Sequence, residues 1–323
     1  MATSRSWRPH TVDGPARARV DDIGELNQVF SDAFTERYRR DGMVGVRVPF
    51  LNPLIWRYAI EDAADGAMLW RDDRGHVVAF NMVHRSGTEG WMGPLAVRTE
   101  YQGGGTGKDI VARGLDWLKR NDAAVIGLET MPRTMDNIGF YSRLGFVPGR
   151  LTLTTTLDAA LDDTPARLVG RLGSQDKSDV IDECRALLRR LAPGYDYTRE
   201  ITLTDDLSLG DTALLYDGSR LVGFALAHTT PLVEGRAREE LRVLKLVLED
   251  ETRFPDLIRV IGDFARRSGT RRVGYRMQGE YASTYQRLVA LGGHVRWTDL
   301  RMTYGTYAEP RPEKGIVLSN WEI

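Results

Sequence analysis

Apolar and polar residues follow two different periods along this chain. Between residues 22 and 40 the apolar side chains recur every three or four positions, which is the spacing of one face of an α-helix. Residues 67–71, 76–84 and 91–97 instead form short apolar runs, and the turn Asp-Asp-Arg-Gly joins the first two. The pattern therefore predicts a fold that mixes helices with the strands of a sheet.

The same reading along the whole chain predicts two similar series of elements. In the first half, helices are expected at 22–40, 53–62, 107–120 and 137–144, and strands at 67–71, 76–84, 91–97, 124–129 and 151–157. In the second half, helices are expected at 178–191, 255–267 and 282–291, and strands at 212–216, 221–229, 241–249, 272–277 and 294–304. The last strand of each series is expected to complete the sheet of its own half.

Two segments of the first half return in the second half at one fixed offset. Residues 77–84 (VVAFNMVH) resemble residues 221–228 (LVGFALAH), so each position lies 144 residues from its partner. At the same offset, YSRL at 141–144 returns as YQRL at 285–288. A shared offset indicates two copies of one fold. We therefore expect a first domain at 1–158, a linker at 159–177 rich in Asp, Thr, Ser and Gly, and a second domain at 178–323.

Length and composition agree with this division and exclude several classes of protein. A chain of 323 residues is long enough for two domains. Its 44 basic and 45 acidic residues give a net charge of −1, which argues against a nucleic-acid partner. It has no apolar run long enough for a membrane span and no secretory signal, so we expect a cytoplasmic protein. The single cysteine, Cys184, excludes an intramolecular disulfide and a cysteine-based zinc site.

The third predicted strand of the first half runs into a cluster of glycines, at 103, 104, 105 and 107. Such a loop can direct several backbone N–H groups at an anion beside the N-terminus of the following helix, which indicates a pyrophosphate site. A Walker A loop would need Gly at Gln102 and Ser or Thr at Asp109. A dinucleotide fingerprint would need Gly at Lys108 or Ile110. The alternative without a ligand is a glycine-rich turn that caps the helix.

The spacing that fits is Gln-x-x-Gly-x-Gly, which Gln102, Gly105 and Gly107 provide after the strand Leu95-Ala96-Val97. This segment resembles the acetyl-coenzyme A motif of the GNAT N-acetyltransferase superfamily. Residues 137–146 (NIGFYSRLGF) are similar to a second motif of that family, in which an Asn is followed by Tyr and Leu-Gly-Phe. The resemblance covers about residues 17–157.

The resemblance implies an α/β fold with a mixed sheet, here as two tandem GNAT-like domains. It also implies direct transfer of an acetyl group from acetyl-coenzyme A, as co-substrate and without a metal, to a primary amine of a small molecule or peptide. The residues that the resemblance assigns to the coenzyme are Leu95, Ala96, Val97, Gln102, Gly103, Gly104, Gly105, Thr106, Gly107, Lys108, Asn137 and Tyr141.

Three residues are candidates for moving protons. The family motif has a tyrosine at the position of Tyr141, which would act as general acid toward the leaving thiolate; a core tyrosine is the alternative. Glu89 and Glu129, near strand ends, are candidates for the base that deprotonates the amine, and each could equally be an ordinary carboxylate. The acceptor pocket is expected at the loop 41–53 with Tyr38 beside it.

The second copy lacks the glycine loop. After its strand it reads EDETRFPD at 249–256, with acidic residues and a proline where a pyrophosphate would need N–H donors. We therefore expect a single active site, in the first copy. Two further functions stay open: an acyl-coenzyme A-binding regulatory protein without turnover, and a transferase for a longer acyl group. The sequence also leaves open the acceptor and whether the chain forms homo-oligomers.

Overall fold

The computed structural model of this protein describes residues 11–159, 165–305 and 309–322. Its helices are α1 (Ile23–Arg40), α2 (Pro53–Ala63), α3 (Thr106–Arg120), α4 (Met135–Arg143), α5 (Ser174–Leu191), α6 (Thr198–Asp206), α7 (Phe254–Arg267) and α8 (Ala282–Ala290). Its strands are β1 (Val12–Arg17), β2 (Ala67–Asp72), β3 (Val77–Ser86), β4 (Glu89–Val97), β5 (Val125–Thr130), β6 (Phe146–Asp158), β7 (Arg167–Leu168), β8 (Gly210–Asp217), β9 (Arg220–His228), β10 (Glu240–Leu248), β11 (Arg272–Gln278), β12 (His294–Tyr304) and β13 (Ile316–Ser319).

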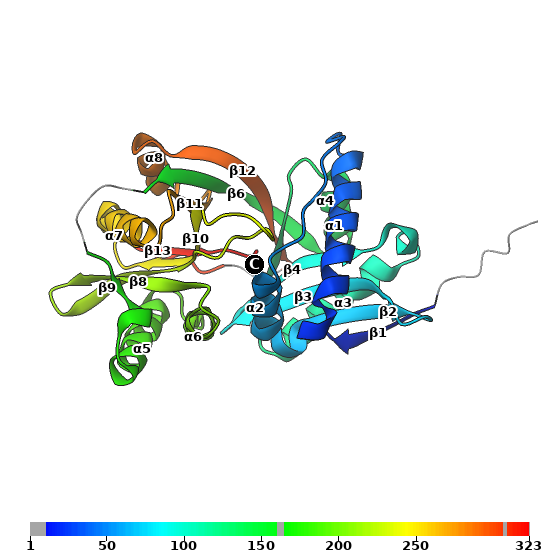
Figure 1. The fold of residues 1–323 in the computed structure, drawn as a ribbon, viewed down its shortest axis with the longest axis horizontal. Helices are drawn as coiled ribbons and strands as arrows, with labels where there is room; N and C mark the ends of the chain where they lie inside the picture. The colour runs from blue at the N-terminus through cyan, green and yellow to red at the C-terminus, as the bar shows by residue number, and fades with distance from the viewer. Residues whose placement is uncertain (1–10, 160–164, 306–308, 323) are drawn as a thin grey trace, which may run out of the picture.

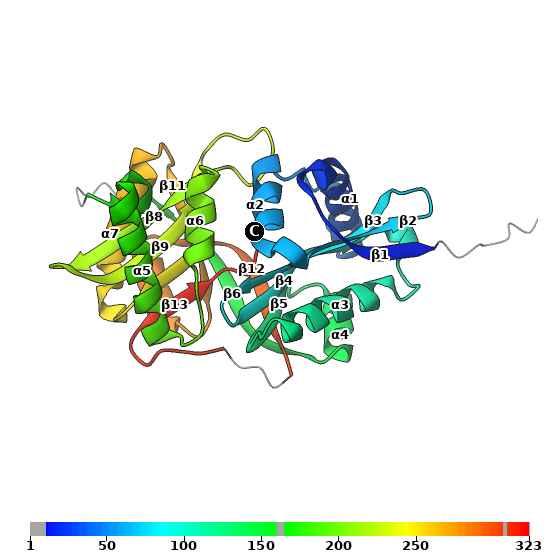
Figure 2. The same ribbon diagram turned by 90° about the horizontal axis from the view of Figure 1, so that it is seen from below.

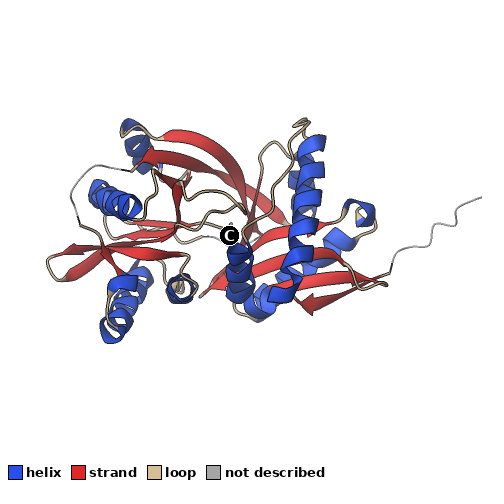
Figure 3. Cartoon of the chain, viewed as in Figure 1, coloured by secondary structure: helices blue, strands red, loops and turns tan. Residues whose placement is uncertain are grey.

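The strands form one continuous sheet through both halves (Figure 1), in the order β1-β2-β3-β4-β5-β12-β6-β11-β10-β9-β8-β7, and β13 pairs with β10. Helices lie on both faces, with loops at the strand ends (Figure 3). In the first half, α1 and α2 lie on one face and α3 and α4 on the other (Figure 2). Burying both faces explains why strands such as β3 are almost continuously apolar.

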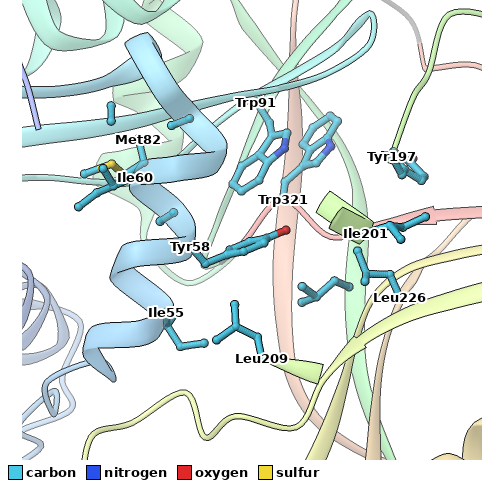
Figure 4. Packing of buried hydrophobic residues seen from close by; sticks show 14 of the residues in the cluster. Ile55, Tyr58, Ile60, Met82, Trp91, Tyr197, Ile201, Leu209, Leu226 and Trp321 are labelled. Atoms are coloured by element: carbon cyan, nitrogen blue, oxygen red, sulfur yellow. The ribbon is translucent and has the colours of Figure 1, made fainter. Parts of the chain in front are cut away.

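Buried apolar residues form three clusters, one of which joins the two halves. One lies under α3 and α4, and another under α7. The third combines residues of α1, α2, α5 and α6. Figure 4 shows its centre, where Tyr58 of α2 lies near Trp91 and Trp321. The halves therefore share a core and do not pack as two independent globules.

Every helix and strand predicted from the pattern is present, most with ends shifted by one or two residues. Among the described residues, one helix and three strands were not predicted: α6, β1, β7 and β13. Most of β1 is exposed, so it has no apolar alternation to detect. The sequence TREITLTDD of α6 is rich in β-branched residues, which do not favour helices. The four-residue β13 is too short for a reliable period.

The last strands of the two halves are exchanged, and this corrects the expectation that each completes its own sheet. β12 pairs antiparallel with β5 of the first half, with Met302 opposite Leu128. β6 pairs antiparallel with β11 of the second half, with Asp158 opposite Arg272. β6 and β12 also pair with each other. An apolar run identifies a strand but not its neighbour, because pairing depends on contacts that are distant in sequence.

The segment 159–177, expected as a linker, contains regular structure where the structure describes it. Arg167–Leu168 pairs with β8 as β7, a 3-10 turn follows at Val169–Arg171, and α5 begins at Ser174. Short regular elements thus lie within the segment expected as a linker, and 160–164 lie outside the described residues. The domain boundaries at 158 and 178 stay a prediction.

Polar side chains are buried where the halves meet. The Lys245 ammonium lies 3.7 Å from Glu89 and 3.9 Å from Glu200 and donates a hydrogen bond of 2.7 Å to Ser319. The Ser86 hydroxyl donates to Glu200. The pKa of Glu200 is raised to about 8, chiefly by burial and also by the charge of Asp62, while Lys245 opposes the rise. A carboxylate of this kind is protonated in the folded protein at neutral pH.

This arrangement predicts that stability falls as pH rises. Because the pKa of Glu200 is raised on folding, the folded state binds its proton more tightly, so the free energy of unfolding decreases from about pH 4.3 to about pH 8. Glu200→Gln cannot ionise and is expected to be more stable relative to the parent at pH 8 than at pH 5, by on the order of 2–4 kcal/mol. Urea denaturation of both proteins at the two pH values measures this difference. The exposed Glu234→Gln is the control, and equal pH dependence in parent and Glu200→Gln would contradict the prediction.

Candidate active site

A cavity of about 880 Å³ lies between the two halves. The first half contributes residues of α1, β4, the glycine loop, the end of β5 and α4. The second half contributes residues of β10, β11 and β12 and the segment Asn320–Glu322 that follows β13. The cavity therefore connects the predicted coenzyme loop with a wall that belongs to the second copy.

The glycine loop is open toward this cavity. Gly103 and Gly105 have φ angles of +84° and +93°, which residues with a Cβ rarely adopt. A Cβ built on either would meet no atom within 4 Å, so the space beside the loop is free. Among the described residues, the backbone N–H groups from Gly103 to Lys108 donate no hydrogen bond. These donors lie at the N-terminus of α3, an arrangement that favours anions.

Gln102 ties this loop to the strand before it. Its side-chain amide donates to the backbone carbonyl of Val97 at 2.9 Å and accepts a hydrogen bond from Arg40 at 3.2 Å. The first contact holds the loop against the end of β4, and the second holds it against α1. The glutamine of the sequence motif thus has a structural role in the shape of the loop.

β4 separates from β5 beside the cavity. Their parallel pairing covers only Glu89 to Met92. The pairing of β4 with β3 is irregular around Gly93 and Pro94, where the proline has no N–H group to donate to a neighbouring strand. Beyond this point the edge of β4 that faces away from β3 has no paired strand among the described residues. Leu95, Ala96 and Val97 line the cavity there.

Tyr141 and Asn137 face the same cavity from α4. The Tyr141 ring packs against Phe140 and Phe146, with centroids 5.2 and 6.0 Å away, and the residue is 7% exposed. Burial raises the pKa of Tyr141 well above its ordinary value, so its hydroxyl stays protonated at neutral pH. The Asn137 amide is 3.5 Å from the Thr130 hydroxyl.

The cavity includes most, but not all, of the residues selected from the sequence. Those that line it are Leu95, Ala96, Val97, Gln102, Gly103, Gly105, Gly107, Lys108, Glu129, Asn137 and Tyr141. Gly104 and Thr106 belong to the same loop but do not line the cavity. Glu89 is also absent from the lining; Trp321 covers it and donates a hydrogen bond of 2.8 Å to its carboxylate. The structure thus separates Glu89 from the other candidates.

Glu129 is held in an ion-pair network. Its two oxygens lie 2.6 Å from Arg276 and 2.9 Å from Arg301, and Thr152 donates to one of them at 2.5 Å. Burial alone would raise the pKa of Glu129, but the two arginines outweigh it and keep the pKa below its ordinary value. A carboxylate stabilised in this way is a weak base, so the geometry does not favour proton abstraction by Glu129.

The second half has a different structure at the position of the glycine loop. A 3-10 turn at Glu251–Arg253 leads directly into α7, and Pro255 removes an N–H group in its first turn. The Asp250 carboxylate accepts hydrogen bonds from the backbone and the hydroxyl of Thr252, at 2.8 and 2.7 Å. An acidic side chain thus occupies the place where the first half offers free donors.

Sequence reasoning missed the residues that the second half adds to the cavity, among them Trp297, Asp299, Trp321 and Glu322. No motif marks them, because they reach the first half only through the exchanged strand β12 and the segment after β13. Trp321 packs so closely on β5 that a Cβ at Gly127 would lie 2.0 Å from its ring. Only the absence of a side chain at Gly127 allows this contact.

Comparison with known proteins finds a sequence likeness in the first half of the chain. The model of the acetyltransferase (GNAT) family matches residues 26–146. N-alpha-acetyltransferase 30 of Schizosaccharomyces pombe is 33% identical over 96 residues, which are 28% of this chain and 64% of that protein. The chain therefore spans less than two thirds of that relative. The segment that resembles the GNAT acetyltransferase family contains the glycine loop and Tyr141.

Solved structures extend the similarity to the whole chain. A Pyrococcus horikoshii protein described as an acetyltransferase has a TM-score of 0.68 at 16% identity, over 99% of this chain and 98% of its own. A tandem GNAT protein from the clavulanic acid biosynthesis pathway has a TM-score of 0.60 at 12% identity, over 94% and 100%. Saccharomyces cerevisiae N-myristoyltransferase has a TM-score of 0.62 at 11% identity, over 94% and 81%. At these identities the likeness concerns the fold, which is that of two tandem GNAT-like halves.

The described residues contain no candidate for a membrane-spanning helix or for a metal site. No helix there is long and apolar enough to cross a membrane. No group of three or more His, Cys, Asp or Glu side chains in that part of the chain is arranged to hold a metal ion.

Proposed function

We propose that this protein is an N-acetyltransferase that moves an acetyl group from acetyl-coenzyme A directly to a primary amine, with its active site where the glycine loop of the first half lines the cavity between the halves. The observation that carries this proposal is the loop from Gly103 to Lys108. Its N–H groups donate no hydrogen bond among the described residues and lie at a helix N-terminus beside the cavity that Tyr141 also lines.

The described residues fit the three parts of the coenzyme thioester. The glycine loop suits the pyrophosphate, with Lys108 adding a positive charge. The unpaired edge of β4 at Leu95 to Val97 suits the amides of the pantetheine arm, which would extend the sheet as an added strand. A backbone N–H of Leu95 or Ala96 would then polarise the thioester carbonyl as a small oxyanion hole.

In the transfer step, the neutral amine nitrogen attacks the thioester carbonyl carbon, an N–C bond forms and the C–S bond breaks, which releases the coenzyme thiolate, and the proton that the nitrogen loses passes to solvent water. Tyr141 donates a hydrogen bond to the sulfur as negative charge develops on it. The raised pKa of Tyr141 lies above the pKa of about 8.5 that is usual for a thiol, so the phenol stabilises the thiolate without a complete proton transfer. We assign no proton transfer to Glu89 or Glu129, given their contacts.

The proposal is tested by thiol release from acetyl-coenzyme A in the presence of diverse amines, including polyamines, aminoglycosides, amino acids and peptides. We expect thiol release that depends on at least one amine, with one acetylated amine formed per thiol by mass spectrometry. Calorimetric binding of acetyl-coenzyme A without thiol release for any amine would contradict the enzyme and favour the regulatory binding protein.

A transferase for a longer acyl group is the second candidate, because one part of the cavity is apolar. Phe30, Ala33 and Phe34 of α1, with Leu51 of the following loop, line it there. The related fold of a protein solved with bound myristoyl-CoA supports the same candidate. Competition between acetyl-, butyryl-, octanoyl- and myristoyl-coenzyme A distinguishes the two, since the preferred acyl group has the largest kcat/KM.

A further inference from the structure

The end of the cavity that faces the second half contains two aromatic rings from different halves. Tyr38 belongs to α1 and Trp297 to the exchanged strand β12, and their ring centroids are 6.4 Å apart. Both line the cavity, and Trp297 is 37% exposed although it is large and apolar. An exposed tryptophan beside a tyrosine provides flat apolar surface and ring faces that attract cations.

Three carboxylates surround one guanidinium at the same end of the cavity. Arg276 lies 2.6 Å from Glu129, 3.0 Å from Asp299 and 2.8 Å from Glu322. The Trp297 indole N–H also donates to Asp299, at 3.2 Å, which connects the carboxylates to the aromatic pair. The charges of Glu322 and Asp299 contribute to the raised pKa of Tyr38, after burial, which indicates that all these groups lie near one another.

Carboxylates outnumber arginines among the residues that line this end of the cavity: Glu129, Glu240, Asp299 and Glu322 against Arg242 and Arg276. Arg301 also contacts Glu129, at 2.9 Å, but Glu309 shares it at 2.5 Å. Glu240 and Arg242 line the cavity too and add one charge of each sign. The pKa of Glu322 is raised to about 7, chiefly by burial and also by the charges of Asp299 and Glu129, while Arg276 opposes the rise. Glu322 lines the cavity, and its side chain is 48% exposed.

We propose that Tyr38, Trp297, Asp299 and Glu322 form an acceptor subsite that binds a cationic amine without an acidic group, such as a diamine or an arylalkylamine. This inference rests on the proposed acetyl transfer and adds the class of acceptor. An ammonium group in the subsite interacts with Asp299 and Glu322, which share the single guanidinium of Arg276, and with the ring faces, while the methylene or aryl body packs on Trp297. A carboxylate on the acceptor meets the unbalanced negative charge and is repelled.

Matched pairs of acceptors that differ by one carboxylate test the subsite directly. The pairs are cadaverine and lysine, agmatine and arginine, and tryptamine and tryptophan, each compared by thiol release with acetyl-coenzyme A. We expect kcat/KM at least tenfold higher for the amine than for the amino acid in at least one pair. The ratio within a pair cancels effects on coenzyme binding and on general folding, which makes it specific for acceptor recognition.

Variants of the subsite are expected to lower this ratio. Glu322→Gln, near the end of the chain and half-exposed, is expected to reduce it at least threefold while the KM for acetyl-coenzyme A changes less than twofold. Trp297→Leu is expected to raise the KM for tryptamine more than that for cadaverine. The exposed Glu313→Gln, in the same C-terminal segment, is the control and is expected to leave the ratio unchanged.

Equal or better use of the amino acids, or an unchanged ratio in Glu322→Gln and Trp297→Leu, would overturn the subsite while leaving acetyl transfer intact. Absence of thiol release with every amine would instead contradict the proposed function. In that case the binding of the same pairs to the coenzyme-bound protein is measured by calorimetry. Tighter binding of the amine than of the matching amino acid supports the subsite, and equal binding overturns it.

Discussion

Gly107→Glu is expected to weaken acetyl-coenzyme A binding at least ~100-fold, which corresponds to about 2.8 kcal/mol. Gly107 lies in the first turn of α3 and lines the cavity, so a carboxylate there repels the pyrophosphate that the loop is proposed to bind. The substitution is compatible with the fold, because Gly107 has no positive φ angle and a Cβ would lie 3.5 Å from Phe140 at ordinary contact distance.

The Gly107→Glu variant is expected to be more stable than the parent, although it binds the coenzyme less tightly. An acidic residue in the first turn of a helix interacts favourably with the helix dipole, by ~0.3–1 kcal/mol, and replacing a helical glycine adds to this. Calorimetric titration with acetyl-coenzyme A and thermal unfolding measure the two effects. Gly107→Ala is the matched control, which gains stability without a charge and is expected to retain binding. Undiminished coenzyme affinity in a folded Gly107→Glu protein would show that the loop does not hold the pyrophosphate.

Tyr141→Phe is expected to lower kcat by ~10²–10³, the usual cost of removing one hydrogen-bond donor to a developing negative charge. The substitution removes only the hydroxyl that faces the cavity and keeps the ring contacts with Phe140 and Phe146. Acetyl-coenzyme A affinity and the melting temperature are expected to stay close to those of the parent. Steady-state thiol release with a productive amine measures the effect.

The repeat supplies a matched control for this variant. Tyr285 of α8 is the partner of Tyr141 in the second copy, where the glycine loop is missing. Tyr285→Phe makes the same chemical change at the equivalent position and is expected to leave kcat unchanged. Equal activity of Tyr141→Phe and the parent would remove the support for a role of Tyr141 in thiolate release.

The two glutamates considered as bases illustrate the limit of reasoning from sequence. Glu89 and Glu129 each lie near a strand end, where a side chain can reach a cavity. The structure pairs Glu129 with Arg276 and Arg301 and covers Glu89 with Trp321. All three partners come from the second half, at separations of 147 or more residues. No local pattern reports such contacts, so exposure and charge at these positions could not be predicted.

The sequence by itself determined the order and type of nearly all helices and strands and the repeat, and it selected the glycine loop and Tyr141, which line the cavity. These features depend on contacts within a few residues: apolar periodicity, glycines in a turn, and the start of a helix. Only the tertiary structure decided that β6 and β12 exchange between the halves, which brings Trp297 and Asp299 to the cavity, and that the segment after β13 brings Glu322 there. The physical reason is that strand pairing and charge balance are set by residues far apart in the chain, which meet only when the sheet forms.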